Sequence, residues 1–435
     1  MAESKWKPYP QYKKSNGPTD MLPISWSEVR FRMLFDTQKG KIPSEIHPEA
    51  LPDSIPYVSM EYLREGTGSQ HVIPEQGSVI IEEDDMMILW DGSNAGEVLK
   101  SKYGILSSTA AKISPKNDEC RDFDFFSLKS MESLIKSGNT GMGIPHVGGD
   151  FLKELCLPRP GLDEKKKIAQ FLNHRTEIIH SGITRLKQKL LILEEKRSTL
   201  ITQAVTKGLN SNVPMKDSGI DWLGQIPDHW HTAFLDKIVD STRRVTYGIV
   251  QPGEPDPNGI FMVRGQNYSF GWSEPSEIFR VSPEIEAAYS RARLKAGDIV
   301  MTIVGAGTGN IAVVPNWLDG ANITQTTARV TIDKKYGINR YFAYLLQSAV
   351  GVTNVEQSVK GAAQPGLNLT HLVKFRMLIP PISEQERIAN HLDDSTKLID
   401  DVIVISKQKI EKLKEYQTAL ISAAVTGKID VRGQA

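Results

Sequence analysis

Apolar residues recur every seven positions along two stretches of the chain, residues 160–209 and 380–429. Neither stretch contains a proline after its first two residues. A second series of positions follows the first at a spacing of four, as in a coiled-coil heptad. The first stretch carries Leu172, Ile179, Leu186, Leu193 and Leu200 with Thr176, Ile183, Leu190, Arg197 and Ala204, and the second carries Leu392, Ile399, Ser406, Leu413 and Leu420 with Thr396, Ile403, Ile410, Gln417 and Ala424. This spacing predicts one long helix with an apolar seam in each stretch.

The two stretches are copies of each other. They align at a constant offset of 220 residues without a gap, and 18 of the 50 aligned positions are identical. An internal repeat with matched heptads predicts that the two helices pair with each other as an antiparallel coiled coil. About 40 helical residues at a rise of 1.5 Å each would give a rod of roughly 60 Å. The alternative is two separate core helices.

A module of short apolar runs, punctuated by glycine and proline, precedes each helix. The modules share anchors: residues 12–15 resemble 215–218, residues 22–26 resemble 226–230, residues 109–113 resemble 326–330, and Asp85, Gly92 and Gly96 match Asp298, Gly305 and Gly309 in spacing. Short runs of this kind predict a small sheet or barrel with long loops. The predicted fold class is α+β, with two β-rich modules alternating with two long helices that pair as an antiparallel coiled coil, in an internal pseudo-two-fold repeat.

The repeat divides the chain into six segments. They are an N-terminal extension (1–25), module 1 (26–158), the first helical spacer (159–209), a linker (210–229), module 2 (230–380) and the second helical spacer (381–430). Each module leads into the N-terminus of its own helix, so antiparallel pairing would place the modules at the two ends of a rod. Two readers at a fixed separation suit a target with two half-sites, as in dimeric DNA-binding proteins.

Composition excludes some classes of protein. The formal net charge is zero, so bulk charge indicates no partner. The two cysteines, Cys120 and Cys156, lack metal-ligand spacing and are interpreted as reduced thiols of a cytoplasmic protein. We expect neither a signal peptide nor a membrane span, because the N-terminus has no apolar core and no run approaches about 18 apolar residues.

No motif predicts catalysis or a metal site. The glycine-rich residues 305–310 fit neither the phosphate-loop pattern nor the dinucleotide fingerprint, so we interpret them as a tight turn between strands. His229 and His231 have no further ligand cluster nearby and are interpreted as surface histidines. Acidic residues 82–85 could hold a cation, although an acidic turn is the preferred interpretation.

Three segments carry a resemblance to a known family. Residues 215–230 (MKDSGIDWLGQIPDHW), 380–392 (PPISEQERIANHL) and 420–429 (LISAAVTGKI) resemble the specificity subunits of type I restriction–modification systems. The resemblance covers nearly the whole chain, although residues 160–166 (PGLDEKK) depart from the family's Pro-Pro-x-x-Glu-Gln-Glu pattern.

The resemblance implies a non-catalytic, sequence-specific DNA recognition subunit in the bacterial or archaeal cytoplasm. Each module would be a target recognition domain that reads one half-site of a bipartite double-stranded target. Two methyltransferase subunits would pack on the helical spacers, and restriction subunits would join them. S-adenosylmethionine, ATP and Mg²⁺ would be bound by those partners, and this chain would bind no cofactor.

Candidate DNA contacts lie in polar and basic loops, because Arg, Asn and Gln read base edges and Lys and Arg bind phosphates. In module 2 we expect base contacts from Arg264, Gln266 and Asn267, phosphate contacts from Arg243, Arg244 and Lys360, and further contacts from Tyr247 and Gln364. In module 1 the candidates are Lys39, Lys41, Ser59, Tyr62, Arg64, Asn139 and Thr140. The alternative for each is a solvated loop residue.

The charge of the two modules differs. Residues 26–157 carry 13 Lys/Arg and 21 Asp/Glu, whereas residues 230–380 carry 15 and 12. Because phosphate binding requires positive surface, we expect the isolated chain to bind DNA poorly without its partners. Two rival functions remain open: a coiled-coil scaffold whose modules bind proteins, and a fragment of a fused methyltransferase–nuclease.

Overall fold

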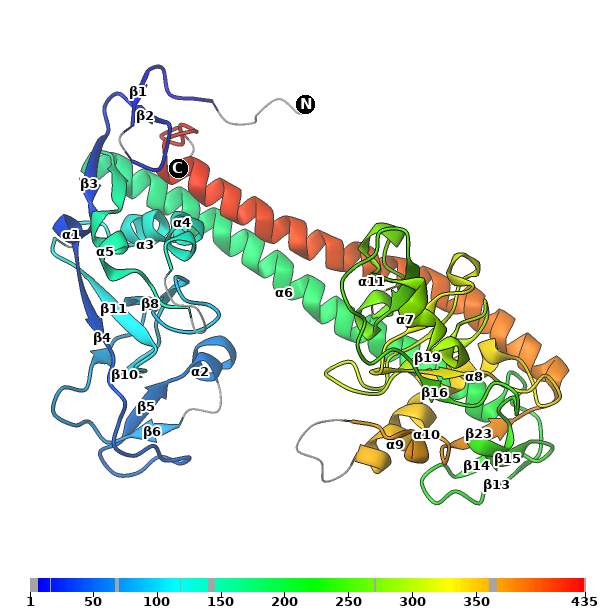
Figure 1. The fold of residues 1–435 in the computed structure, drawn as a ribbon. Coiled ribbons are helices and arrows are strands. Elements are labelled where there is room, and N and C mark those ends of the chain that lie inside the picture. The colour runs from blue at the N-terminus through cyan, green and yellow to red at the C-terminus, as the bar shows by residue number, and fades with distance from the viewer. Residues whose placement is uncertain are drawn as a thin grey trace. The chain divides into compact units, whose positions relative to one another are not determined.

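A computed structural model describes residues 7–15, 17–66, 70–117, 119–139, 145–269, 271–359 and 366–433. The chain divides into two compact units (Figure 1). Unit 1 comprises residues 1–185 and 409–435, and unit 2 comprises residues 186–408. Each unit therefore joins one module to segments of both long helices.

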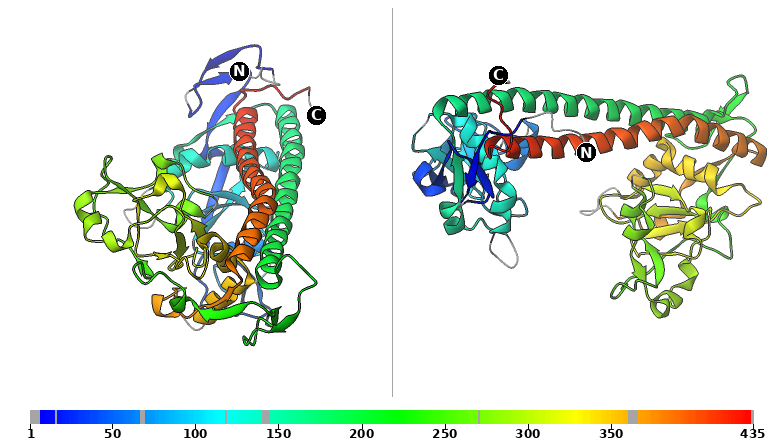
Figure 2. Two further views of the ribbon diagram at one scale, coloured as in Figure 1. Left: turned by 90° about the vertical axis from the view of Figure 1, so that its right-hand side faces the viewer. Right: turned by 90° about the horizontal axis from the view of Figure 1, so that it is seen from above.

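The two long helices are α6, Leu162–Lys207, and α11, Ile382–Val425. In unit 2 the ion pairs Glu194–Lys407 (Oε1–Nζ 3.1 Å) and Arg197–Asp400 (Nε–Oδ1 2.6 Å) join them. The pair that lies later on α6 (Arg197) lies earlier on α11 (Asp400), so the two helices run antiparallel. Figure 2 shows them side by side. The seam is buried as the heptads predict, at Ile183 and Leu190 of α6 and Ile403, Ile410 and Leu420 of α11. The predicted antiparallel coiled coil is confirmed.

Both long helices end at a glycine in the left-handed conformation, Gly208 and Gly427, each with φ of 73°. Glycine adopts this conformation without the steric cost of a Cβ atom, so it commonly terminates helices. Gly208 lies beside Trp230 and Glu384, and Gly427 lies beside Trp26. The two tryptophans are fully buried. The C-terminal end of α6 therefore packs on Trp230 of module 2, and that of α11 packs on Trp26 of module 1.

Module 1 is built on two sheets. One has the strand order β4-β11-β8-β9 and the other β6-β5-β10-β7, while β3 and β12 pair where the chain enters and leaves the module. The strands are β3 Ser27–Arg30, β4 Phe35–Lys39, β5 Ile55–Val58, β6 His71–Val72, β7 Ile80–Ile81, β8 Met86–Leu89, β9 Val98–Lys100, β10 Gly104–Leu106, β11 Ala110–Pro115 and β12 Cys156–Arg159. The helices are α1 Phe31–Leu34, α2 Met60–Glu65, α3 Arg121–Ser130, α4 Glu132–Ser137 and α5 Gly149–Glu154.

Module 2 repeats this frame. Its main sheet has the order β16-β22-β19-β20, its second sheet β18-β17-β21, and β15 pairs with β23 at its entrance. The strands are β15 His231–Phe234, β16 Thr246–Tyr247, β17 Ile260–Val263, β18 Arg280–Val281, β19 Ile299–Thr302, β20 Ile311–Val313, β21 Asn322–Ile323, β22 Thr327–Val330 and β23 Arg376–Ile379. The helices are η1 Leu235–Lys237, η2 Gly265–Tyr268, η3 Pro275–Glu277, α7 Pro283–Ala287, η4 Ser290–Ala292, η5 Asn316–Leu318, α8 Asn339–Gln347, α9 Ala349–Val359 and α10 Leu369–Leu372.

The main sheets of the two modules match strand by strand, whereas the second sheet has four strands in module 1 and three in module 2. The parallel pair β5–β10 of module 1 corresponds to the parallel pair β17–β21 of module 2. Upstream of each module lies an equivalent two-stranded hairpin, β1 Tyr12–Lys14 with β2 Met21–Pro23 and β13 Met215–Asp217 with β14 Gln225–Pro227. The predicted duplication of the whole module is therefore confirmed, including the resemblance between residues 12–15 and 215–218.

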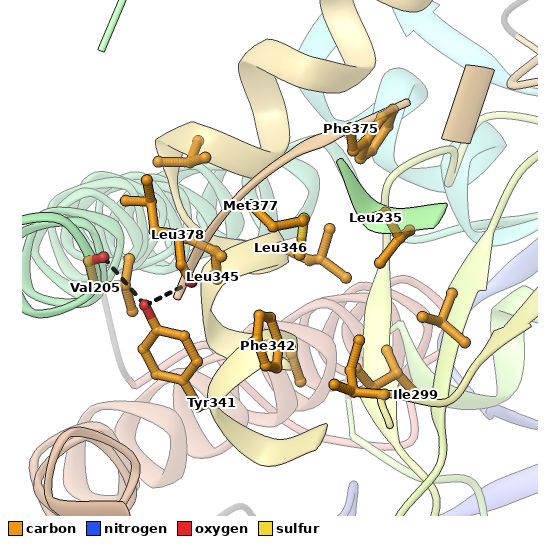
Figure 3. Close-up of a cluster of buried hydrophobic side chains, with 14 of the residues drawn as sticks. Val205, Leu235, Ile299, Tyr341, Phe342, Leu345, Leu346, Phe375, Met377 and Leu378 are labelled. Carbon is orange, nitrogen blue, oxygen red and sulfur yellow. Dashed lines mark hydrogen bonds between the residues drawn. The ribbon is translucent and has the colours of Figure 1, made fainter. Parts of the chain in front are cut away.

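The core of module 2 is continuous with the end of α6 (Figure 3). Phe342 and Leu345 of α8 pack with Leu378 of β23 and with Val205 of α6 in one buried cluster. Tyr341 is also fully buried, and its hydroxyl donates to the carbonyls of Val205 and Leu378, both at 3.4 Å. This packing fixes the sheet of module 2 on the coiled coil within unit 2.

Candidate nucleic-acid interface

Equivalent turns join the central strand to the edge strand of the main sheet in both modules. In module 1 the turn between β8 and β9 contains Gly92 and Gly96, with φ of 100° and 96°. In module 2 the turn between β19 and β20 contains Gly305 and Gly309, with φ of 103° and 95°. The interpretation of residues 305–310 as a tight turn is confirmed, and both modules use the same backbone conformation at this place.

In module 1, three predicted contact residues meet this turn. Lys39 pairs with Asp91 (Nζ–Oδ2 2.7 Å), Arg64 lies 3.8 Å from Glu97 (Nη2–Oε2), and Asn139 donates to the carbonyl of Ala95 at 2.9 Å. The side chains of Lys39 and Arg64 remain 46% and 59% exposed, so both can still reach a ligand. The structure therefore gathers Lys39, Arg64 and Asn139 around one turn, although they are far apart in the sequence.

Asp91 is the acidic centre of this group. His146 also contacts it, with Nδ1 2.5 Å from Oδ1. Burial by itself would raise the pKa of Asp91, but the hydrogen bonds with Lys39 and His146 hold this pKa below its usual value. Nothing in the sequence marked Asp91 or His146 as members of the site, because 55 residues separate them.

The other candidates of module 1 lie elsewhere or serve the local fold. Ser59 caps α2, where its Oγ accepts from the backbone N–H of Tyr62 at 3.2 Å. Tyr62 lies under the Lys102 ammonium, 5.1 Å from the ring centroid, and Lys41 is exposed. The cap explains Ser59 without any ligand. Thr140 lies outside the described residues.

In module 2 the helix η2 and the β19–β20 turn form a second polar group. The hydroxyls of Tyr268 and Thr302 lie 2.8 Å apart, and Nδ2 of Asn310 donates to Oγ of Ser269 at 3.2 Å. Gln266, also on η2, is exposed. Ser269, Thr302 and Asn310 are not among the contacts predicted from the sequence, although Asn310 follows the glycine turn directly.

Arg264, which directly precedes η2, and Asn267 within η2 differ in accessibility. The guanidinium of Arg264 stacks on Phe279, 4.6 Å from the ring centroid, and the residue is only partly exposed. Asn267 is 2% exposed, and its Oδ1 accepts from the backbone N–H of Arg264 at 2.9 Å. The prediction of a base contact by Asn267 is therefore wrong in this structure, because its amide is used inside the loop.

Arg243 is likewise occupied within the protein. Its Nη1 and Nη2 donate to the two carboxylate oxygens of Asp298 at 2.6 and 2.8 Å, and Nη2 also donates to the carbonyl of Arg293 at 3.0 Å. Asp298 is 2% exposed. The predicted phosphate contact by Arg243 is corrected to a structural ion pair, since a bidentate partner already fills its donor edge.

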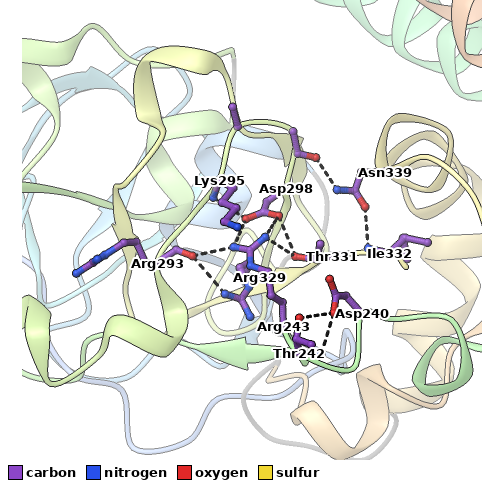
Figure 4. A network of polar contacts seen from close by, with 12 residues as sticks. Asp240, Thr242, Arg243, Arg293, Lys295, Asp298, Arg329, Thr331, Ile332 and Asn339 are labelled. Carbon is purple, nitrogen blue, oxygen red and sulfur yellow. Dashed lines mark hydrogen bonds and ion pairs between the residues drawn. The ribbon is translucent and has the colours of Figure 1, made fainter. Parts of the chain in front are cut away.

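Arg244, by contrast, lines an open basic pocket of about 690 Å³ next to β16. The pocket is lined by residues 241–246, Ser290, Arg291, residues 293–295, Asp319, Gly320 and Arg329. Figure 4 shows the polar contacts of Arg243, Asp298 and Arg329 at this place. Tyr247, the next residue on β16, is 39% exposed. Lys360 and Gln364 lie outside the described residues.

Neither a metal-ligand cluster nor a membrane-spanning helix is found in the described part of the chain. Within residues 7–433, less the gaps given above, no group of three or more His, Cys, Asp or Glu side chains could hold a metal ion. None of the helices found there is long and apolar enough to cross a membrane. His229 pairs with Glu384, with 2.7 Å between Nε2 and Oε2, and His231 is exposed.

Comparison with known proteins agrees with this duplicated architecture. The family model described as "Type I restriction modification DNA specificity domain" matches twice, over residues 23–190 and 258–415. The chain belongs to this DNA specificity family. The two matches cover module 1, most of module 2 and most of both long helices, and they correspond to the repeat seen in the structure.

Relatives of this specificity family match nearly the whole chain. The MjaVIII type I restriction enzyme specificity subunit of Methanocaldococcus jannaschii is 30% identical over 94% of each chain. The EcoBI specificity subunit of Escherichia coli is 25% identical over 88% of this chain and 82% of its own. A solved structure from work on assembly and conformational transition of the type I restriction–modification system covers 94% of this chain and 99% of its own, with a TM-score of 0.53 at 16% identity. This last likeness supports the fold.

Proposed function

We propose that this chain is the DNA recognition subunit of a type I restriction–modification complex, and that each module reads one half-site of a bipartite target. The observation that carries the proposal is that both modules have the same turn between equivalent strands but different polar side chains around it. The glycine turn meets Lys39, Arg64 and Asp91 in module 1. In module 2 it meets the η2 loop, where Asn310 donates to Ser269 and Gln266 is exposed.

The two groups suit different ligand edges. Lysine and arginine donate to guanine O6 and N7, whereas amide side chains pair with adenine N6 and N7. Module 1 offers a cationic group balanced by Asp91, and module 2 offers neutral amide and hydroxyl groups. Two readers with one frame and different polar side chains would give two different half-sites.

The chain would act within a larger complex. Methyltransferase subunits would dock on the helical spacers and supply S-adenosylmethionine chemistry, and restriction subunits would supply ATP- and Mg²⁺-dependent cleavage. The names of the relatives as specificity subunits support this division of labour, as does the solved structure from work on complex assembly. We propose that this chain contributes recognition and no catalytic group, in the cytoplasm of its host.

Methylome sequencing of cells that carry the whole system tests the proposal. A bipartite methylated motif is expected, and exchange of residues 230–380 for another module of the family should change one half of that motif only. A change in both halves, or the absence of any methylated motif in cells with active partners, would contradict the assignment of one module to one half-site.

A point variant separates DNA reading from a scaffold role. Gln266→Ala removes an exposed amide and should relax the motif at one position, with a loss of about 1–3 kcal/mol in discrimination if the amide reads a base. Lys335→Ala is the matched control, because its side chain is 65% exposed in the same module and lies outside the polar group. A protein scaffold would treat both variants alike.

A further inference from the structure

The basic pocket of module 2 contains a buried guanidinium that forms no ion pair with a carboxylate in the described part of the chain. Arg329 is 3% exposed, and its Nη atoms donate to the carbonyls of Arg291 (2.8 Å), Arg293 (3.2 Å) and Arg244 (2.9 Å). Its Nε has no hydrogen-bond partner among the residues that the structure describes. Carbonyl groups orient the guanidinium but carry no negative charge, so no carboxylate neutralises Arg329 by direct contact among the described residues.

Module 1 shows how the equivalent position can be neutralised. Arg329 pairs across the sheet with Val300 and Thr246, as Lys112 does with Met87 and Gln38. Lys112 pairs directly with Asp85 (Nζ–Oδ2 2.6 Å). In module 2 the matching acid, Asp298, is taken by Arg243 instead. The replacement leaves Arg329 with carbonyl acceptors only.

A second difference lies two residues before Thr246 and Gln38 on the neighbouring strand. Module 1 has Asp36 there, paired with Lys116 at 3.4 Å, whereas module 2 has Arg244, which lines the pocket. The position that carries an acidic residue in module 1, Asp36, therefore carries a basic residue in module 2, Arg244. This local inversion accounts for part of the charge difference between the modules.

The walls of the pocket add further positive charge. Arg244, Arg291 and Lys295 line it with exposed side chains that form no ion pair within the described part of the chain. Arg293 is paired with Glu286 (Nε–Oε1 2.9 Å), and Asp319 is the one carboxylate among the lining residues. Burial and the neighbouring Arg243 charge lower the pKa of Arg329, although Asp298 and Asp240 act in the opposite direction. An anion would be favoured at this place.

We propose that this pocket is a phosphate-binding site of module 2 that takes a phosphodiester of the DNA backbone, with no counterpart in module 1. The inference rests on the proposed function and deepens it. A volume of about 690 Å³ leaves room for the sugars on both sides of a phosphate, and the partly exposed Val245 gives the wall apolar surface against which a sugar can pack. Arg329 is 3% exposed and its Nη atoms already donate to three carbonyls, so it would favour the anion through its charge. The exposed Arg244, Arg291 and Lys295 side chains would donate to the phosphate.

The salt dependence of DNA binding tests the site. The full chain, assembled with its methyltransferase partners, is titrated with duplex DNA that carries the methylated motif of the system. Arg291→Ala/Lys295→Ala should lower the slope of log K against log salt by about 0.9 for each phosphate that the protein no longer neutralises, and should leave the methylated motif unchanged. Both side chains are exposed, so the variant is expected to fold.

The control is Lys237→Ala/Lys335→Ala. It removes the same charge from the same module at side chains that are 70% and 65% exposed and that do not line the pocket. Equal slopes for the two double variants would overturn the inference while leaving the proposed function intact. A wild-type complex without specific DNA binding would overturn both.

A second measurement distinguishes DNA from free phosphate. Thermal unfolding of the full chain is compared in inorganic phosphate and in chloride at equal ionic strength. If phosphate stabilised the wild type but not Arg291→Ala/Lys295→Ala, and the DNA salt slopes were equal, the pocket would bind a free oxyanion and the DNA assignment would be overturned. A lower slope for the pocket variant alone supports the DNA phosphodiester.

Discussion

The ion pair between Arg243 and Asp298 should be a principal support of module 2, and Arg243→Met removes one side of it. The two hydrogen bonds measure 2.6 and 2.8 Å, and the Arg243 and Asp298 side chains are 16% and 2% exposed. Removal of one partner of a buried pair costs about 3–5 kcal/mol, because the other charge is left uncompensated.

The lower end of this range is expected here. Asp298 keeps hydrogen bonds from the backbone N–H of Lys295 at 2.7 Å and from the Thr331 hydroxyl at 2.9 Å. The pocket beside Arg243 also admits water, which can partly solvate the carboxylate. We therefore expect the free energy of unfolding of module 2 to fall by about 3 kcal/mol.

Hydrogen exchange of the β19 and β22 amides measures this loss within unit 2. A probe of one unit is preferable to a global signal, because a chain with two compact units need not unfold in one step. Arg244→Met is the control, since it removes an exposed arginine from the adjacent position and should change stability by no more than about 0.5 kcal/mol. If the two variants differed by less than about 1 kcal/mol, the structural role assigned to Arg243 would be refuted. In a double-mutant cycle, Asp298→Asn should recover part of the loss caused by Arg243→Met.

Three other polar contacts give testable expectations. Asn267→Ala should destabilise module 2 by about 1–2 kcal/mol in urea unfolding, because it leaves the N–H of Arg264 without its acceptor; an unchanged midpoint would argue against the buried amide. Glu384→Gln should lower the free energy of unfolding by about 1–2 kcal/mol, because the hydrogen bond from Trp230 becomes weaker. The midpoint of unfolding, followed by tryptophan fluorescence, should move to a lower denaturant concentration. The pKa of Asp91 is lowered in the folded state, so its contribution is present above the unfolded pKa of about 3.9 and is lost as the pH falls through the folded value. Lys39→Met should therefore be less stable than wild type at pH 7, with the difference narrowing below about pH 4 in unfolding curves; a constant difference would contradict the linkage.

The sequence predicted those features that depend on periodicity. The heptads of residues 172–200 and 392–420 placed the seam of the coiled coil, and the constant offset of 220 residues identified the duplication. Glycines at matching intervals predicted the turns, because a backbone position with positive φ favours glycine over other residues.

The roles of individual polar residues could not be predicted in the same way. Arg243 and Arg244 are adjacent, yet one pairs with an acid 55 residues away and the other lines the pocket. Asn267 and Gln266 are also adjacent, yet one is buried and one exposed. Such differences arise from the direction in which a loop turns each side chain, and a single sequence contains no periodic signal for it.

The division of the chain into units has a consequence for the order in which they can fold during synthesis. Unit 2 is one continuous segment, residues 186–408, and it is inserted between the two parts of unit 1. The Tyr12 hydroxyl donates to the carbonyl of Gly427, 415 residues later, so the N-terminal unit is completed only when the last helix has been made. N-terminal domains usually fold first on the ribosome, whereas we expect unit 2 of this chain to complete its fold before unit 1. Shortening of the C-terminus should then harm the module that was synthesised first, and leave the one nearest to the truncation in sequence intact.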